Sequence, residues 1–337
     1  MRSPRLAKIV FRFVLVAAVS LGGIAGGTAA SVFSLYKSTD QGSTWVKAGL
    51  GLPPDARINA LEVAGTVEVA GTDRGIFVSR DAGLNWQPAT QGVGTEARVL
   101  CLTTQAGRVF AGTHQHGVLV SSDGGATWRP VNYRQKGRRI RSLLPVGSKL
   151  YAGIDHPGVF VSADAGTTWT NLSAGLPEAS QVFDLAVVGE TVFAALYSRG
   201  LFRWEEARGQ WSRVGDVAPL ELVAIGKTLV VGHNPGGVFV SEDRGATWQN
   251  GSAGLPVNAP VWTLAAREGQ VFVGTTGKLG LDAEDVSLFA SKDQGKSWTR
   301  SDSGLPVPGA AISFAITGEF ILVGIVSPKR ESGAVAP

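Results

Sequence analysis

SSDGGATW, residues 121–128, is one of six well-formed copies of the pattern S-x-D-x-G-x-[ST]-W in this chain. The other five are STDQGSTW (38–45), SRDAGLNW (79–86, with Asn for Ser/Thr), SADAGTTW (162–169), SEDRGATW (241–248) and SKDQGKSW (291–298). A seventh, degenerate copy keeps only Glu206 and Trp211 at matching positions. The copies recur about every 41 residues. Such a period in a strand-rich chain predicts a propeller or a similar array, because one unit cannot bury its own hydrophobic face.

Each repeat is predicted to form four strands. In the unit at 57–89 these are INALEVAG, TVEVAGT, GIFVSRD and NWQPA, with Val, Ile and Phe inside the runs and Gly, Asp or Asn at their ends. The chain begins with two strands (32–38, 45–48) and ends with two (312–318, 319–325). Pairing them closes the ring and removes the exposed sheet edges. We therefore predict an all-β fold, a single seven-bladed propeller with four antiparallel strands per blade, spanning residues 31–326.

The two ends of the chain differ from the repeats. Residues 1–30 combine Arg2, Arg5, Lys8 and Arg12 with an apolar run and then small residues. This is the pattern of a secretory signal peptide. The alternative is an uncleaved membrane anchor through residues 9–30, although the apolar run is short for a span of roughly 20 residues. Residues 327–337 are expected to form a flexible tail. We expect an exported protein, periplasmic or extracellular, or one anchored in the inner membrane.

Charge and cysteine content exclude some classes of partner. The chain has 31 basic and 27 acidic residues, but residues 1–30 hold four of the basic ones and none of the acidic ones. The remainder is therefore electrically neutral, and we expect no nucleic-acid partner, which normally requires a basic face. Cys101 is the only cysteine and lies in an apolar run, so we interpret it as a small buried hydrophobe.

The repeated motif itself has a structural interpretation. Its Asp can accept backbone N–H bonds across a hairpin, its Gly allows an unusual backbone angle, and its Trp packs between blades. Seven of the nine tryptophans occupy this one position. We therefore assign a scaffold role, and no catalytic role, to Asp40, Asp81, Asp123, Asp164, Asp243 and Asp293.

These motifs resemble the Asp-box, or bacterial neuraminidase, repeat over residues 31–326. That repeat occurs in sialidases, xyloglucanase-type glycosidases, sortilin-type receptors and photosystem II assembly factors. The resemblance implies a propeller but does not choose among these families, because one fold carries many functions.

The chain departs from the enzymes of this group. Sialidases carry an F/Y-R-I-P segment, whereas the nearest string here is A-R-I-N at 56–59. None of the four tyrosines lies in a recognisable catalytic motif. Xyloglucanase-type enzymes divide their catalytic carboxylates between two propellers, and this chain has one. We therefore predict no catalytic residues and no cofactor.

Strand direction places a candidate site on one face of the ring. Blade connections and the loops between the second and third strands share one face, and the repeated motifs lie on the other. Arg57, Arg98 and Arg139 precede the first strand of three successive blades, whereas Gln181, Pro219, Pro260 and Ala311 stand in the later ones. Such an arc suits bidentate capture of a carboxylate or phosphate. Arg134, Lys136, Arg138 and Arg141 add positive charge nearby. The alternative is that these are solvated residues paired with loop acids such as Glu96.

Histidines gather in the same set of loops. His114, His116, His156 and His233 all follow a second strand. His114, His116 and Asp155 offer ligands that metals use, but their spacing matches no recognised zinc pattern, and we predict no metal site.

The sequence thus favours an exported, non-catalytic, assembly-factor-like propeller that binds a protein partner or an anionic or glycan ligand through its Arg and His residues. Two alternatives remain open. One is a sialidase-like glycoside hydrolase that uses the arginines as a carboxylate clamp, and the other is a structural interaction subunit of the cell envelope.

Overall fold

The computed structural model describes residues 31–89, 91–94, 97–131, 137–233, 236–275, 287–306 and 309–328. These residues form strands, turns and loops, with no helix among them. Accordingly, no described helix is long and apolar enough to cross a membrane. The proposed leader and nearly all of the proposed tail lie outside the described residues.

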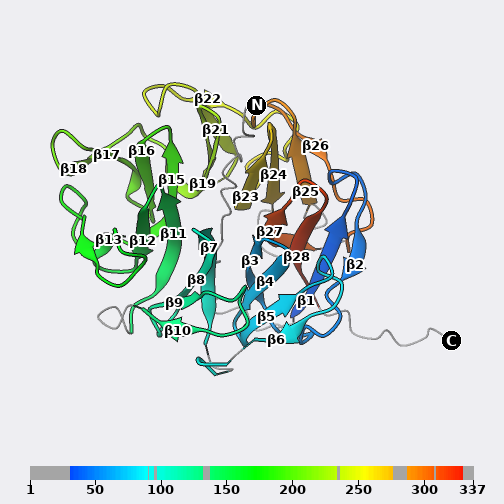
Figure 1. Cartoon of the computed structure of the whole chain (residues 1–337). Coiled ribbons are helices and arrows are strands. Elements are labelled where there is room, and N and C mark those ends of the chain that lie inside the picture. The colour runs from blue at the N-terminus through cyan, green and yellow to red at the C-terminus, as the bar shows by residue number, and fades with distance from the viewer. Residues whose placement is uncertain are drawn as a thin grey trace, which may run out of the picture.

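The described strands form seven four-stranded sheets (Figure 1). The first blade contains β3 (Ile58–Ala64), β4 (Val67–Thr72), β5 (Gly75–Ser79) and β6 (Gln87–Pro88). The second contains β7 (Val99–Gln105), β8 (Arg108–Thr113), β9 (Val118–Ser121) and β10 (Arg129–Pro130). The third contains β11 (Ile140–Val146), β12 (Lys149–Ile154), β13 (Gly158–Ser162) and β14 (Thr170–Asn171). The fourth contains β15 (Val182–Val188), β16 (Thr191–Leu196), β17 (Gly200–Glu205) and β18 (Gln210–Arg213).

The remaining blades follow the same order. The fifth contains β19 (Pro219–Ile225), β20 (Thr228–His233), β21 (Val238–Ser241) and β22 (Gln249–Asn250). The sixth contains β23 (Val261–Arg267), β24 (Gln270–Thr275), β25 (Ser287–Ser291) and β26 (Thr299–Arg300). The seventh joins both ends of the chain, in the order β2 (Val46–Ala48), β1 (Ser31–Ser38), β28 (Ile321–Pro328) and β27 (Ala310–Ile316).

The blades form a closed ring, and the first strand of each blade lies innermost. In cyclic order β3, β7, β11, β15, β19, β23 and β27 contact one another, and β27 contacts β3 again (Figure 1). The first five residues of β3, β7 and β11 are buried and the last two are partly buried, because neighbouring blades cover both faces of these inner strands. Gly71 of β4 permits the close approach, since a Cβ there would overlap Val99 of the next blade. The prediction of an all-β, seven-bladed propeller is confirmed.

Ring closure follows the expected pairing with a shift of boundaries. β1 pairs antiparallel with β28 from Ser31↔Pro328 to Ser38↔Ile321. The last hairpin turns at Thr317–Phe320, where the Thr317 hydroxyl accepts the Phe320 N–H at 2.8 Å. β27 therefore begins and ends two residues earlier than the expected 312–318, and β28 begins two residues later than the expected 319. Ser327 and Pro328, which the sequence assigned to the tail, belong to β28.

The repeated motifs form compact turns between the third and fourth strands, which we call signature turns. In the turn at 121–128, the Ser121 hydroxyl donates to Asp123 at 2.7 Å and accepts the Gly125 N–H at 2.8 Å. Thr127 donates both its hydroxyl and its N–H to the same carboxylate. These bonds, with the Thr127 hydroxyl first, lower the pKa of Asp123 to about 2. The other five signature turns have the same Ser–Asp–Gly geometry.

The degenerate copy in the fourth blade keeps this bracing with different residues. Trp204 stands where the other turns have Ser, and Glu206 stands where they have Asp. The Trp204 indole N–H donates to the Glu206 carboxylate at 2.6 Å, which replaces the Ser–Asp bond. The β17–β18 hairpin is consequently longer than the hairpins of the intact copies.

In five blades the backbone N–H of the signature tryptophan also links the blade to the preceding one, at Trp45, Trp86, Trp128, Trp211 and Trp298. The Trp45 N–H donates to the Ser303 carbonyl at 2.9 Å, and its indole N–H donates to the Ser301 carbonyl at 2.6 Å. The next residue, Gly304, has φ +91° and lies directly against the Trp45 carbonyl oxygen. Gly51, Gly92, Gly175 and Gly254 lie in the same way against Trp86, Trp128, Trp211 and Trp298. The Trp and Gly positions of the repeat are therefore paired across blades.

One fully buried carboxyl group makes the stability of the ring dependent on pH. Glu62 of β3 is fully buried, and its Oε1 accepts long bonds from Thr104 and from the Val63 N–H, both at 3.3 Å. Burial raises the pKa of Glu62 well above its usual value. The folded state thus holds this proton more tightly than the unfolded state. The stabilisation from this tightly bound proton is fully present below the pKa of Glu62 in the unfolded state. It is lost as the pH rises through the pKa of Glu62 in the folded state.

We predict that Glu62→Gln stabilises the protein at pH 8 relative to wild type, by about 1.4 kcal/mol for each unit of pKa shift removed. The difference should shrink as the pH approaches 4.5. Urea unfolding of both proteins across this range measures it. Glu190→Gln, at an exposed turn position, serves as the control. A Glu62→Gln difference that stays constant with pH would contradict the assignment.

Candidate functional site

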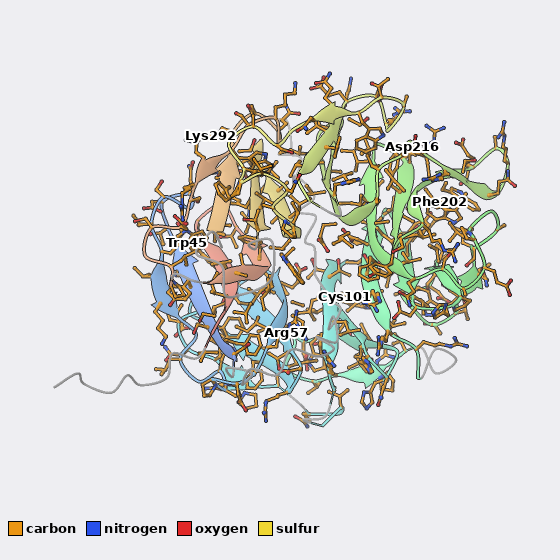
Figure 2. All side chains as sticks on the ribbon, turned by 180° about the vertical axis from the view of Figure 1, so that it is seen from behind. Trp45, Arg57, Cys101, Phe202, Asp216 and Lys292 are labelled. Carbon is orange, nitrogen blue, oxygen red and sulfur yellow. The ribbon has the colours of Figure 1, made fainter. Side chains whose placement is uncertain are left out.

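The joining face is the end of the ring at which the chain enters the first strand of each blade. In four successive blades one backbone hydrogen bond recurs there, between the residue after the second strand and the residue before the first. The N–H groups of Asp73, His114, Asp155 and Tyr197 donate to the carbonyls of Arg57, Arg98, Arg139 and Gln181, at 2.9–3.2 Å. The fold therefore repeats one pair of positions and varies its side chains from blade to blade. Figure 2 places Arg57 nearer the middle of the ring than Lys292 of a signature turn, which lies at the rim.

A contact across blades fixes the orientation of Arg139. Its Nε–H donates to Nε2 of His114, in the preceding blade, at 2.8 Å. Because Nε2 accepts this bond, a neutral His114 carries its proton on Nδ1. Burial, followed by the charges of Arg139, Arg98 and Arg141, lowers the pKa of His114. His114 is therefore an uncharged acceptor at neutral pH, surrounded by three guanidinium groups.

A buried ion pair lies beneath this contact. Arg141 of β11 is 3% exposed and binds both carboxylate oxygens of Asp155, through its Nε and through its Nη2 at 2.7 Å. Arg139 reaches the same carboxylate at 3.8 Å. The guanidinium of Arg141 also lies over the ring of Phe183 in the next blade, 4.5 Å from its centroid. Asp155 and Phe183 thus hold Arg141 in one place.

Several arginines on the joining face have hydrogen-bond donors without a partner. Within the described part of the chain, Nε of Arg57, Nε of Arg98 and Nη1 of Arg141 are buried and have no hydrogen-bond partner. Burial, and secondly the charge of Arg98, lowers the pKa of Arg57 to about 10. An unpaired buried donor is costly, and a charged one more so. These donors leave positive charge uncompensated in three successive blades, beside the half-exposed side chain of Arg139, and this charge favours an anion. We call Arg57, Arg98, Arg139, Arg141, His114 and Asp155 the Arg–His cluster.

The structure does not bring all the predicted site residues together. His233 is the last residue of β20, in the fifth blade, where its ring packs edge-on against Phe239 at 5.0 Å. His156 is exposed in the third blade, with φ +43° and Nε2 at 3.4 Å from Gln181 Nε2. Nδ1 of His116 is buried without a hydrogen-bond partner in the described part of the chain, and the backbone N–H of His116 donates to the Thr113 hydroxyl at 2.8 Å. Among the described residues no His, Cys, Asp and Glu side chains gather as a metal site.

Strand register revises two of the equivalences drawn from the sequence. Pro219 and Ala311 align with Ile58, not with Arg57, so Ala218 and Ala310 occupy the arginine position in their blades. Pro260 aligns with Arg57 as expected. Arg134, Lys136 and Glu96 lie outside the described residues. Arg138 is described, and its guanidinium donates to the His156 carbonyl.

Two aromatic residues, which were not predicted as site residues, extend the Arg–His cluster. Phe183 occupies the same register position as Arg141, and Tyr197 the same position as His114 and Asp155. Their rings stack with a centroid distance of 4.9 Å, and Tyr197 is 40% exposed. Comparing equivalent positions between blades would have found both, because each replaces a cluster residue in the next blade.

Comparison with known proteins supports the fold. The family model of the DUF6242 beta propeller domain matches residues 70–195. No curated protein sequence matches the chain significantly.

Several solved structures are similar in fold. YCF48 bound to D1 peptide matches with a TM-score of 0.63 and 18% identity, over 80% of this chain and 92% of that one. The extracellular domain of the putative one component system BT4673 from B. thetaiotaomicron has a TM-score of 0.68 and 15% identity, over 88% of this chain and 40% of that one. The GH74 xyloglucanase from Xanthomonas campestris has a TM-score of 0.50 and 15% identity, over 78% of this chain and 55% of that one. At these identities the likeness concerns the fold alone.

Proposed function

We propose that this propeller is a non-catalytic binding module that captures a carboxylate group of a protein partner on its joining face. The observation that carries the proposal is the set of buried, unpaired guanidinium donors of Arg57, Arg98 and Arg141 within the described residues. A carboxylate accepts such donors in pairs and compensates their charge. The solved complex of a similar propeller, YCF48, with a peptide gives a precedent for peptide binding by this fold.

The arrangement favours binding over hydrolysis. Asp155, the carboxylate within the Arg–His cluster, has both oxygens bound by Arg141 and also faces Arg139, so it is not free to act on a substrate. The signature-turn aspartates are held by their own turns, and each lies at the opposite end of its blade from the cluster. The leader pattern in residues 1–30 further supports a location outside the cytoplasm, which sequencing the N-terminus of the mature protein from the envelope fraction would test.

The test uses a library of random hexapeptides without Asp or Glu that have free C-terminal carboxylates, and the same library amidated. We predict that immobilised wild-type protein retains the carboxylate library over the amidated one. Arg98→Ala and Arg139→Ala should each weaken retention about tenfold or more, which is the loss of one or more hydrogen bonds to a charged group. Arg129→Ala, which removes an exposed arginine of the outer strand β10, is the matched control for net charge.

Equal retention of both libraries, or equal loss in Arg129→Ala, would contradict the proposal. The glycosidase alternative is tested in parallel with fluorogenic sialosides and plant glucans. Turnover that disappears in Arg98→Ala would replace the binding function with a hydrolytic one.

A further inference from the structure

The Arg–His cluster continues into an aromatic surface across the blade boundary. Arg139 lies 3.8 Å from Asp155, and Asp155 binds Arg141. Arg141 lies 4.5 Å from the Phe183 centroid, which lies 4.9 Å from that of Tyr197. The row therefore runs without interruption from the third blade to the fourth, and it changes from cationic to aromatic along its length.

The two ends of the row differ in accessibility. Phe183 is 9% exposed and is held between Arg141 and Tyr197, so it acts as a support. Tyr197 is 40% exposed and is one of the few large apolar side chains exposed within the described residues. An exposed ring that is stacked on a buried one offers a rigid surface to a ligand, at a low cost in conformational entropy.

We infer that Tyr197, supported by Phe183, forms a subsite for a large apolar or aromatic side chain located next to the C-terminal carboxylate of a bound peptide. The inference rests on the proposed function, since the carboxylate is the group that the Arg–His cluster holds. The spacing fits a peptide. Arg141 and Tyr197 are separated by two ring contacts of 4.5 and 4.9 Å, and an extended chain advances roughly 3.3–3.6 Å per residue. A side chain one to three residues before the carboxylate therefore reaches Tyr197.

The chemistry of the row favours a peptide over an acidic sugar. The group between the cation and the exposed ring is Phe183, whose faces are covered by Arg141 and Tyr197 and whose ring offers a hydroxyl group no hydrogen-bond partner. A sugar acid spanning this distance would place hydroxyl groups against that ring and leave them without partners. An apolar side chain at the same place has no hydrogen bond to lose.

The hexapeptide library with free carboxylates tests this subsite. We predict that peptides retained by wild type are enriched at least fivefold in Phe, Tyr, Trp or Leu at one fixed position among the last four residues. Tyr197→Ala should abolish that enrichment and still retain the carboxylate library over the amidated one. Tyr197→Phe, which preserves the ring, should restore it. Circular dichroism of Tyr197→Ala should match wild type, and its unfolding free energy should fall only by the loss of the ring contact with Phe183.

The possible outcomes distinguish failure of the Tyr197 subsite from failure of the proposed function. Retention of carboxylate peptides without positional enrichment overturns the subsite and leaves the proposed function standing. The subsite is also overturned if Tyr197→Ala keeps the enrichment, or if polygalacturonate displaces the peptides and loses its own binding in Tyr197→Ala. Failure of wild type to prefer carboxylates over amides removes the proposed function and the subsite with it.

Discussion

Replacing Gly304 with alanine is expected to lower the free energy of unfolding by about 3 kcal/mol, through two additive penalties. The first is backbone strain, because Gly304 has φ +91°, where a side chain is disfavoured. The second is steric, because the added Cβ would overlap the Trp45 carbonyl oxygen. To relieve that overlap, the chain would have to move Trp45 away from Ser301 and Ser303, whose carbonyls its two N–H groups bind. These bonds connect the closing blade to the sixth blade.

Gly65→Ala is the matched control for this variant. Gly65 has φ +67°, but a Cβ there would meet no atom within 4 Å. It should therefore show backbone strain alone, about 1 kcal/mol. Urea unfolding of both variants, analysed with a common slope, measures the difference. Equal losses in the two variants would show that the Trp–Gly contact between blades contributes little to closure.

Replacing Arg141 with alanine is expected to cost about 3–5 kcal/mol, because it leaves the buried carboxylate of Asp155 without its bidentate partner. Arg139, at 3.8 Å, is too distant to replace both hydrogen bonds. The Phe183 ring also loses the cation that lies over it. Thermal and urea unfolding measure the loss, and the Arg141→Ala/Asp155→Ala double variant should recover part of it.

An exposed ion pair elsewhere on the ring provides the comparison. The side chains of Arg74 and Asp55 form a pair at 55% and 59% exposure. Arg74→Ala should therefore cost less than about 1 kcal/mol. If Arg141→Ala lowers the free energy of unfolding as little as Arg74→Ala does, Asp155 must find another partner or water. The Arg141–Asp155 pair would then not stabilise the Arg–His cluster.

The fold could be predicted because the repeat records it many times. Each copy of S-x-D-x-G-x-[ST]-W marks one hairpin, and the two incomplete units at the chain ends specify how β1 meets β28. Boundaries were less predictable where one local bond decides them. The Thr317 hydroxyl accepts the Phe320 N–H and closes a turn at 317–320, so β27 ends and β28 begins two residues away from the expected junction between 318 and 319.

The site could be predicted only as far as position equivalence extends. The arginines before three first strands were found because they recur at one place in the repeat. The contact of Arg139 with His114 depends on how neighbouring blades are set against each other, which no repeat alignment contains. Phe183 and Tyr197 were not predicted, because the prediction rested on charged residues and these two positions carry aromatic residues instead. His233 was grouped with the other histidines on sequence position, but β20 extends through it and turns its ring toward Phe239.

The most direct test of the account is to find which face of the ring a carboxylate ligand contacts. A photoreactive amino acid is placed at Gln115, exposed between His114 and His116, or at Lys292, exposed in a signature turn. Each protein is irradiated with the carboxylate and amidated hexapeptide libraries. The account predicts crosslinks from Gln115 to the carboxylate library alone, and their loss when Arg98→Ala is added. Crosslinks of equal yield from Lys292, or from Gln115 to the amidated library, would contradict it.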